Sequence, residues 1–260
     1  MAGGHRIAVI GDVHGNAGAF DAAVRTAVAS GFDELVLLGD LLTYGVDTAA
    51  VVDAAVRLCQ RDDVTLLRGN HDAEYLPGQA ARETGHRPAW VQESIDFTRG
   101  NLPADAFARL PFVDEHVSRG IRFGHANPFG RDDWRYLNTI EDHVAALAEL
   151  ERGGHALGVF GHTHRARLFS SGPDGTGLSF VPQAHLRPGA GVGYIVNAGS
   201  VGQPRDRPRT VHVLLIDATT DGYDVRFVPF DYDVAAHIRS LERAPLSPET
   251  IRRLVGFHRD

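Results

Sequence analysis

The sequence feature that most constrains the fold is an apolar run, Ile7–Ile10, which leads directly into Gly11-Asp12-Val13-His14-Gly15. A short apolar run of this kind is typical of a buried β-strand. The glycines beside Asp12 and His14 allow the backbone to turn sharply there. The strand therefore delivers a carboxylate and an imidazole from its carboxyl end. An Asp and a His two residues apart also occur by chance in loops, so the rest of the chain decides whether they belong to a metal site.

The same pattern of strand, polar loop and helix continues along the first third of the chain. The predicted elements are a helix over 17–30, a strand over 34–38, a helix over 47–61 and a strand over 64–67. Successive units of this type predict a parallel sheet with right-handed crossovers. The second strand ends at Asp40, and the third runs into Asn70-His71-Asp72. Ligands of open α/β sheets bind at such strand ends.

The rest of the chain predicts a change of architecture. Residues 73–120 contain two short predicted helices, 88–100 and 103–110, which we interpret as a helical cap inserted into a single domain spanning 1–260. Further expected elements are a hairpin over 112–123, a helix over 139–152, a strand over 156–160, strand-like segments at 168–171, 178–182, 194–197, 211–216 and 223–230, and helices over 234–243 and 248–255. The late strands predict antiparallel pairing. The whole predicts an α/β fold in which two sheets pack face to face with helices outside.

Composition limits the classes of function. The chain of 260 residues is 43% apolar and 23% charged, which is typical of a soluble globular protein. Its net charge is −7, and its arginines are interspersed with acidic residues, so we expect no stable nucleic-acid complex. No apolar run approaches the roughly 18 residues that span a bilayer. With a single cysteine, Cys59, no internal disulfide can form, and we expect a cytoplasmic protein without a membrane partner. Whether it forms a homo-oligomer stays open.

Nine polar residues at predicted strand ends come from five separate segments. They are Asp12, His14, Asp40, Asn70, His71, Asp72, His125, His162 and His164. Carboxylate and imidazole ligands without thiolate suit Mn, Fe or Zn, and the set is too large for one tetrahedral site. Two ions about 3.5–4 Å apart share a bridging ligand, which a carboxylate can provide and an imidazole cannot. Any single histidine here could be structural, but five such segments need a common cause. We therefore predict a two-metal site, with Mn supporting activity.

The motifs Gly-Asp-x-His-Gly, Gly-Asp, Gly-Asn-His-Asp, Gly-His and Gly-His-x-His follow one another between Asp12 and His164. In this order they resemble the calcineurin-like metallophosphoesterase superfamily. The resemblance implies a four-layer αββα sandwich. By motif position it implies that the first metal is held by Asp12, His14, Asp40 and His164. It implies that the second is held by Asp40, Asn70, His125 and His162, with Asp40 as the shared bridge.

The resemblance also implies a reaction. Enzymes of this kind hydrolyse a phosphate ester by attack of a metal-bridging hydroxide, and the substrate expected here is a small phosphodiester, cyclic nucleotide or nucleotide. His71 is expected either to protonate the leaving oxygen or to stabilise the charge of the transition state, with Asp72 orienting its ring. Relatives with Cys in place of His71 are mostly associated with diesters, so His71 leaves monoester and diester cleavage open.

Other positions narrow the branch of the family. The segment Gly39–Gly45 lacks the Arg-Gly that is usual in protein phosphatases and symmetrical dinucleoside tetraphosphatases. Tyr44-Gly45 and Asn197–Arg205 instead resemble a small bacterial and archaeal phosphodiesterase-like branch, although Ala126 and Arg165-Ala166 depart from its usual pattern. One alternative function is an asymmetrical dinucleoside polyphosphate hydrolase, which this branch includes. The other is a catalytically silent scaffold with the same fold, against which the full ligand set and His71 argue.

Four residues are the predicted substrate contacts. Arg131, Arg135 and Arg205 are chosen because a guanidinium matches phosphate oxygens, although a solvated arginine is the commoner outcome for each. The fourth predicted contact is Asn127, which can reach the site by its loop. Tyr44 can also approach the site by its loop. In the expected cap, Trp90 and Phe97 either stack on a nucleobase or, more commonly, pack in the core. The expected partner is a small, nucleotide-like phosphorylated substrate.

Overall fold

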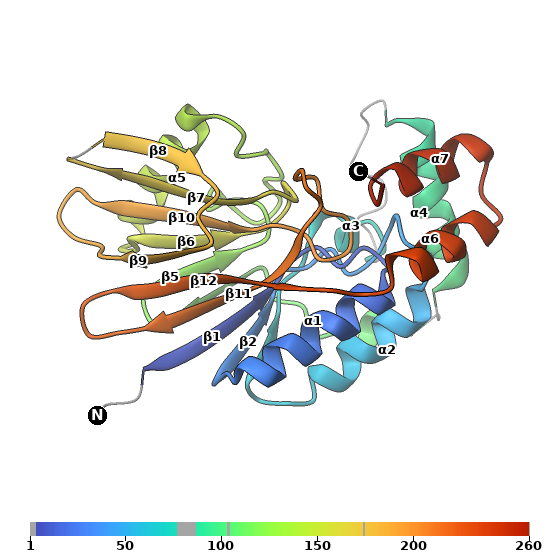
Figure 1. The fold of residues 1–260 in the computed structure, drawn as a ribbon, viewed down its shortest axis with the longest axis horizontal. Coiled ribbons are helices and arrows are strands. Elements are labelled where there is room, and N and C mark those ends of the chain that lie inside the picture. Colours follow the sequence, from blue (N-terminus) through green and yellow to red (C-terminus); the bar gives the residue numbers. More distant parts are fainter. Residues whose placement is uncertain (1–3, 77–86, 103–104, 174, 260) are drawn as a thin grey trace.

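Two mixed sheets of six strands each form the centre of the computed structural model (Figure 1), which describes residues 4–76, 87–102, 105–173 and 175–259. The first sheet has the order β3 (Val64–Leu66), β2 (Glu34–Leu37), β1 (His5–Ile10), β11 (Val211–Ala218), β12 (Tyr223–Phe230) and β9 (Gln183–Leu186). The second has the order β4 (Glu115–Ser118), β5 (Ile121–Gly124), β6 (Leu157–Phe160), β10 (Gly193–Ala198), β7 (Ala166–Gly172) and β8 (Gly175–Ser179). The predicted fold class is confirmed.

Strand directions follow the expected pattern with one exception. In the first sheet β1, β2 and β3 run parallel, joined by α1 (Ala17–Ser30) and α2 (Thr48–Leu58). Strands β11 and β12 pair antiparallel, as predicted for the late part of the chain. Strand β10 lies between β7, to which it is antiparallel, and β6, to which it is parallel. All pairs among the late strands are therefore antiparallel, as predicted, and the exception is the parallel pairing of β10 with β6, a strand from the earlier part of the chain.

Three separate apolar cores show that the molecule has four layers. Alternate residues of β1 face opposite sides, as the strand period requires. Ile7 and Val9 pack between the two sheets, whereas Ala8 and Ile10 pack against α1 and α2. On the far side, the second sheet packs its outer face against α5 (Ile140–Arg152). The order helix, sheet, sheet, helix is the predicted αββα sandwich.

A further group of helices gathers at one end of the sheets (Figure 1). It consists of α4 (Ala89–Asn101), α6 (Val234–Arg243) and α7 (Pro248–Gly256). Contacts between these helices include hydrogen bonds to Glu93 of α4 from the hydroxyls of Ser247 and Thr250. None of the described helices combines the length and the apolar character that crossing a bilayer requires.

The segment predicted as a cap is only partly described, because 77–86 and 103–104 lie outside the described residues. The helix predicted over 103–110 is wrong for the described part, where only a 3-10 turn, η1 (Phe107–Arg109), forms. So short a segment, closed by Pro111, cannot sustain a stable α-helix. The end of the predicted cap, β4, belongs to the second sheet.

Replacing Leu157 by alanine should destabilise the sandwich strongly, because the side chain is fully buried between the two sheets. We expect a loss of about 2–5 kcal/mol in the free energy of unfolding. Urea denaturation in the presence of a chelator measures this change without a contribution from bound metal. The control Val28→Ala removes methyl groups from an exposed position of α1 and should change stability by less than about 0.5 kcal/mol. Equal effects of both variants would contradict the layered core.

Candidate metal centre

The predicted metal ligands meet at one end of the two sheets. Asp12 follows β1, Asp40 follows β2 and Asn70 begins the short helix α3 (Asn70–Ala73) after β3. His125 follows β5, and the pair His162 and His164 follows β6. Strands β1, β2 and β3 run parallel, as do β5 and β6. In each sheet the loops with polar residues therefore follow the carboxyl ends of the strands on the same side.

The ligand atoms form two groups that share one carboxylate. In the first group, Asp12, His14, Asp40 and His164 each place a ligand atom within 4.8 Å of the others, and all four residues are buried. The second group contains Asp40, His125 and His162. The Oδ1 atom of Asn70 lies 3.1 Å from His125 Nε2, which adds the amide to the second group. Asp40 is thus the residue common to both groups.

The donor set fits divalent cations. Asp40 is 1% exposed, and its Oδ2 atom has no hydrogen-bond partner, although it lies 3.6 Å from His14 Nε2 and 3.3 Å from His125 Nε2. The Nε2 atoms of His14 and His164 lie 2.9 Å apart. A buried carboxylate oxygen with unused lone pairs is costly, and ring nitrogens that point at one another need a proton or a cation between them. Ions at these positions would satisfy both requirements.

Backbone carbonyls fix the orientation of the histidine rings. The Nδ1 atoms of His14, His125 and His164 each lie within hydrogen-bond distance of a carbonyl oxygen, which can only accept. The partners are Leu42 (3.0 Å), Leu38 (2.8 Å) and Gln203 (2.8 Å). Since Nδ1 carries a proton in each ring, Nε2 is the atom that faces the centre and is left for a metal ion.

In His162 the two ring nitrogens exchange roles relative to the other three histidines. Its Nε2 atom donates to the carbonyl of Trp134 over 2.8 Å, which leaves Nδ1 for the centre. The ring of Tyr136 stacks on His162 with centroids 4.1 Å apart and planes 19° apart. The loop after His125 therefore returns to hold the ring of a ligand from the next strand. This arrangement was not predicted, because every residue has a carbonyl and the sequence cannot show which one is used.

The ligand loops have an unusual backbone. Asp12, His14, Asp40, His162 and His164 all have positive φ angles, between 47° and 66°. For residues other than glycine this conformation costs about 1–3 kcal/mol each and persists only where the surroundings impose it. Gly69 shows how closely the loops pack, since a Cβ atom there would lie 2.1 Å from Asp40 Oδ1. The strain is concentrated where side chains must be directed into the centre.

Protonation follows from burial and from neighbouring charge. Burial holds the pKa values of His14 and His164 well below the usual range, so both rings are neutral at pH 7. Burial also opposes the charged form of His125, but the facing Asp40 carboxylate outweighs it and raises the pKa to about 9. Burial likewise acts against the charge of Asp40, yet the nearby imidazoles, chiefly His125, hold its pKa well below its usual range. A cation bound between the two residues would therefore displace a proton from His125.

Comparison with known proteins agrees with this geometry. Residues 6–221 match the family described as the calcineurin-like phosphoesterase superfamily domain. The chain belongs to this superfamily. It is 27% identical over 234 residues to the uncharacterized protein MJ0912 of Methanocaldococcus jannaschii, covering 88% of each chain. Its fold is similar to two solved structures. One is a metallophosphoesterase from Sphaerobacter thermophilus (TM-score 0.75, 22% identity, 98% and 99% coverage). The other is the hypothetical protein PH1004 from Pyrococcus horikoshii (TM-score 0.74, 17% identity, 96% and 97% coverage).

Asp72 has a different role in this candidate metal centre from the predicted one. Its Oδ2 atom accepts hydrogen bonds from the amides of Asp40 (2.7 Å) and Gly69 (3.0 Å), and its Oδ1 atom accepts one from Leu41 (3.0 Å). His71 Nδ1 is buried and has no hydrogen-bond partner. The prediction that Asp72 orients the His71 ring is therefore wrong, because α3 turns this carboxylate back onto the loop after β2. Asp72 instead fixes the backbone that carries Asp40.

His71 itself lies beside the first ligand group. Its ring centroid is 5.2 Å from that of His14 and 4.7 Å from that of Tyr44, and both pairs meet edge to face. Its amide donates to Asp40 Oδ1 over 2.8 Å. The residue therefore supports one oxygen of the shared carboxylate with its backbone, while its ring stays available at the centre.

Three of the four predicted substrate contacts are directed elsewhere. Arg131 pairs with Asp114 (3.1 Å) and Arg135 with Asp133 (2.6 Å), and both arginine side chains are 63% exposed. The side-chain amide of Asn127 donates to the carbonyls of Asp133 and Arg135, so it closes its own loop. Acidic neighbours and loop carbonyls therefore satisfy these groups within the protein, and their contact with a substrate stays a prediction.

Arg205, the fourth, does lie at the centre. Its positive charge adds to burial in lowering the pKa values of His71 and His164. One guanidinium nitrogen donates to Gln203 Oε1 over 3.1 Å, while the buried Nε atom has no partner. Trp90, by contrast, stacks on Tyr44 with ring centroids 5.5 Å apart and is part of the packing of the helices.

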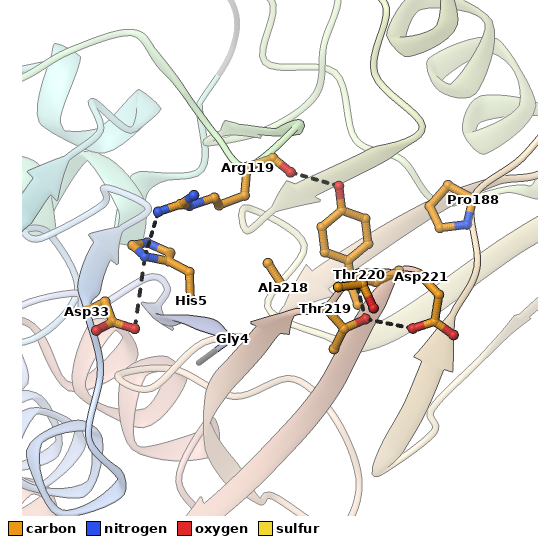
Figure 2. Close-up of a pocket in the computed structure, with 11 residues that line it drawn as sticks. Gly4, His5, Asp33, Arg119, Pro188, Ala218, Thr219, Thr220 and Asp221 are labelled. Atoms are coloured by element: carbon orange, nitrogen blue, oxygen red, sulfur yellow. Dashed lines mark hydrogen bonds and ion pairs between the residues drawn. The ribbon is translucent and has the colours of Figure 1, made fainter. Parts of the chain in front are cut away.

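A surface hollow of about 840 Å³ is lined by His5, Asp33 and Arg119 among others (Figure 2). His5 begins β1, so the hollow lies at the opposite end of this strand from Asp12. Its charged groups pair with one another: Arg119 donates to His5 Nδ1 over 3.1 Å, and His5 lies 3.9 Å from Asp33. Tyr223 donates to the Arg119 carbonyl. None of the described residues that line this hollow belongs to the candidate metal centre.

Replacing Asp72 by asparagine tests its observed role. The amide has one acceptor oxygen instead of two, so at least one backbone N–H around Asp40 loses its partner. We expect metal affinity to fall about 10- to 100-fold and the free energy of unfolding to fall by about 1–3 kcal/mol. Calorimetric titration with Mn²⁺ measures the first quantity and urea denaturation the second. Asp62→Asn, at an exposed position, is the control. Unchanged metal binding would contradict the backbone role.

Proposed function

We propose that this protein is a two-metal phosphoesterase that hydrolyses a small phosphate ester, either a phosphodiester, a cyclic nucleotide or a nucleotide. The observation that carries the proposal is the shared Asp40 carboxylate, one oxygen of which lies unpartnered between two groups of imidazoles. Membership of the calcineurin-like superfamily supports the same reaction class.

Each part of the centre has a distinct task in this reaction. Divalent ions bound there would polarise a phosphoryl oxygen and activate water for in-line attack. The chain holds the ligands rigidly through backbone carbonyls and through Asp72, so little reorganisation is needed when charge develops. Arg205 contributes a fixed positive charge that matches the oxygens of a phosphoryl group.

In this proposal His71 donates a proton to the leaving group. Its ring is held between His14 and Tyr44, and its buried Nδ1 atom has no partner in the protein. Burial lowers the pKa of this ring, so it gives a proton to the ester oxygen only from its protonated form, which the negative charge of a bound phosphate ester favours. The residue is close to the ligands without belonging to either ligand group.

The proposal includes Mn as the activating ion, because a centre of imidazoles, carboxylates and one amide suits it. The proposal also includes a small nucleotide-like substrate. It includes a cytoplasmic location, which is supported by the presence of a single cysteine in the sequence. A screen of aryl monoesters and diesters, cyclic nucleotides and dinucleoside polyphosphates, with Mn²⁺ supplied, ranks the candidate substrates. Asymmetrical cleavage of a dinucleoside polyphosphate as the fastest reaction would identify the alternative function.

Replacing Asp40 by asparagine should abolish the function, because it removes the charge that both ligand groups share. We expect a loss of at least about 100-fold in the hydrolysis of nitrophenyl phosphoesters, together with a lower metal content. Elemental analysis measures the metal, and Asp62→Asn should retain both metal and rate. A wild-type protein that binds no transition metal and hydrolyses no ester would be a scaffold, which would refute the proposal.

Replacing His71 by asparagine should slow the reaction according to the leaving group. Esters of alkyl alcohols need a proton at the departing oxygen, so their rate should fall about 100- to 10,000-fold. Nitrophenyl esters leave as stable anions and should lose much less. Measuring kcat for a series of leaving groups gives this dependence, and the metal content should stay unchanged. An equal loss across the series would contradict the role as proton donor.

A further inference from the structure

Tyr44 is held beside the metal centre by aromatic groups on several sides. Its ring centroid lies 4.8 Å from that of His14 and 4.7 Å from that of His71. Trp90 of α4 stacks on it at 5.5 Å with an interplanar angle of 29°. The residue is only 7% exposed and also belongs to the apolar cluster of α6 and α7. The ring therefore has little freedom to move.

The backbone that carries this ring is strained. Thr43 and Tyr44 have φ angles of 71° and 67°, a conformation that side chains rarely adopt. The Tyr44 amide donates to Ser94 Oγ over 2.8 Å, and a Cβ atom at Gly45 would lie 2.3 Å from the His14 carbonyl oxygen. Contacts on both sides thus impose an unfavourable conformation, which is typical of residues with a functional position.

The hydroxyl group is the one part of Tyr44 that the protein leaves unused. It makes no hydrogen bond within the described part of the chain, and it is not among the fully buried polar atoms without a partner, so part of its surface is accessible. Three other tyrosines do have partners: Tyr75 bonds to Thr43 Oγ1 (2.6 Å), Tyr223 to the Arg119 carbonyl (2.8 Å) and Tyr232 to Asn16 Nδ2 (3.3 Å). A largely buried tyrosine usually directs its hydroxyl to a partner. At Tyr44 that partner is left for a ligand.

The neighbours of this hydroxyl are those expected around a phosphoryl group. Burial raises the pKa of Tyr44, while the nearby charge of Arg205 opposes this effect. The same arginine acts on His71 and on the metal-ligand candidate His164. Tyr44 meets the His71 ring at 4.7 Å between centroids, and the Arg205 amide donates to the carbonyl of His164 over 3.1 Å, so both residues lie beside the centre. Because the phenol stays protonated at neutral pH, it is a hydrogen-bond donor there.

We propose that the Tyr44 hydroxyl donates a hydrogen bond to a non-bridging phosphoryl oxygen of the substrate, acting together with Arg205 and leaving the ester oxygen to His71. This inference rests on the proposed phosphoesterase function and adds a substrate-binding residue to it. Tyr44 supplies a rigid, uncharged donor, which complements the charge of Arg205. The negatively charged acceptor makes such a hydrogen bond stronger than one between neutral groups.

Tyr44→Phe tests the inference, because it removes the hydroxyl and keeps the stacked ring. In the Mn-loaded protein we expect kcat/KM to fall about 10- to 100-fold. The loss should be equal for esters with good and poor leaving groups, in contrast to that of the His71 variant. Inorganic phosphate, measured by calorimetry, should bind about 10-fold more weakly. The metal content should stay as in the wild type.

Tyr223→Phe is the matched control, since it removes a hydroxyl at the far end of the sheets. Its rate and phosphate affinity should equal those of the wild type. Wild-type values for Tyr44→Phe would overturn the inference, and so would a loss of activity that merely follows a loss of metal. A wild-type protein that binds phosphate but cleaves no ester would refute the proposed function alone. Weaker phosphate binding by Tyr44→Phe would then still support the inference.

Discussion

The buried charge of Asp40 is the constraint on which the rest of the centre depends. An ionised carboxylate removed from water is stable only if it is paired or bound to a cation. One oxygen of Asp40 accepts the His71 amide, while the other faces imidazoles without a hydrogen bond. The amide of Asp40 is in turn fixed by Asp72. Hydrogen bonds therefore hold the Asp40 carboxylate in place through one oxygen and the backbone amide. The other oxygen, Oδ2, has no hydrogen bond and is free to bind a metal ion.

The two-sheet architecture makes this arrangement possible, because backbone hydrogen bonds join loops from distant parts of the chain. The His14 amide donates to the Asp40 carbonyl, the Gly161 amide to the His125 carbonyl, and the Val201 amide to the Gly11 carbonyl. Each bond joins the ends of different strands. The positive φ angles of the ligands are maintained by this network. The unfavourable backbone conformation of the ligand residues is therefore stabilised by hydrogen bonds between loops that the two packed sheets hold together.

The sequence predicted the strands and the residues that follow them, because both depend on local patterns. An apolar run followed by Asp12 or by His162 places a ligand at a strand end wherever the strand lies in the sheet. It did not predict the partner of Asp72 or of Arg131, since several groups compete for each and only the folded chain decides which is nearest. The helix predicted over 103–110 was wrong for its described part, because so short a segment before Pro111 forms only a 3-10 turn.

The surroundings of the two ligand groups differ in rigidity. Tyr44, beside the first group, is fixed by Trp90 and by the helices α4, α6 and α7. Tyr136, which stacks on His162 of the second group, is 44% exposed and belongs to a loop. A buried aromatic ring positions a reacting group with little loss of entropy, whereas an exposed one can adjust to different ligands. In the proposed reaction, the first side would therefore position the phosphoryl group, and the second would accommodate the variable part of the substrate.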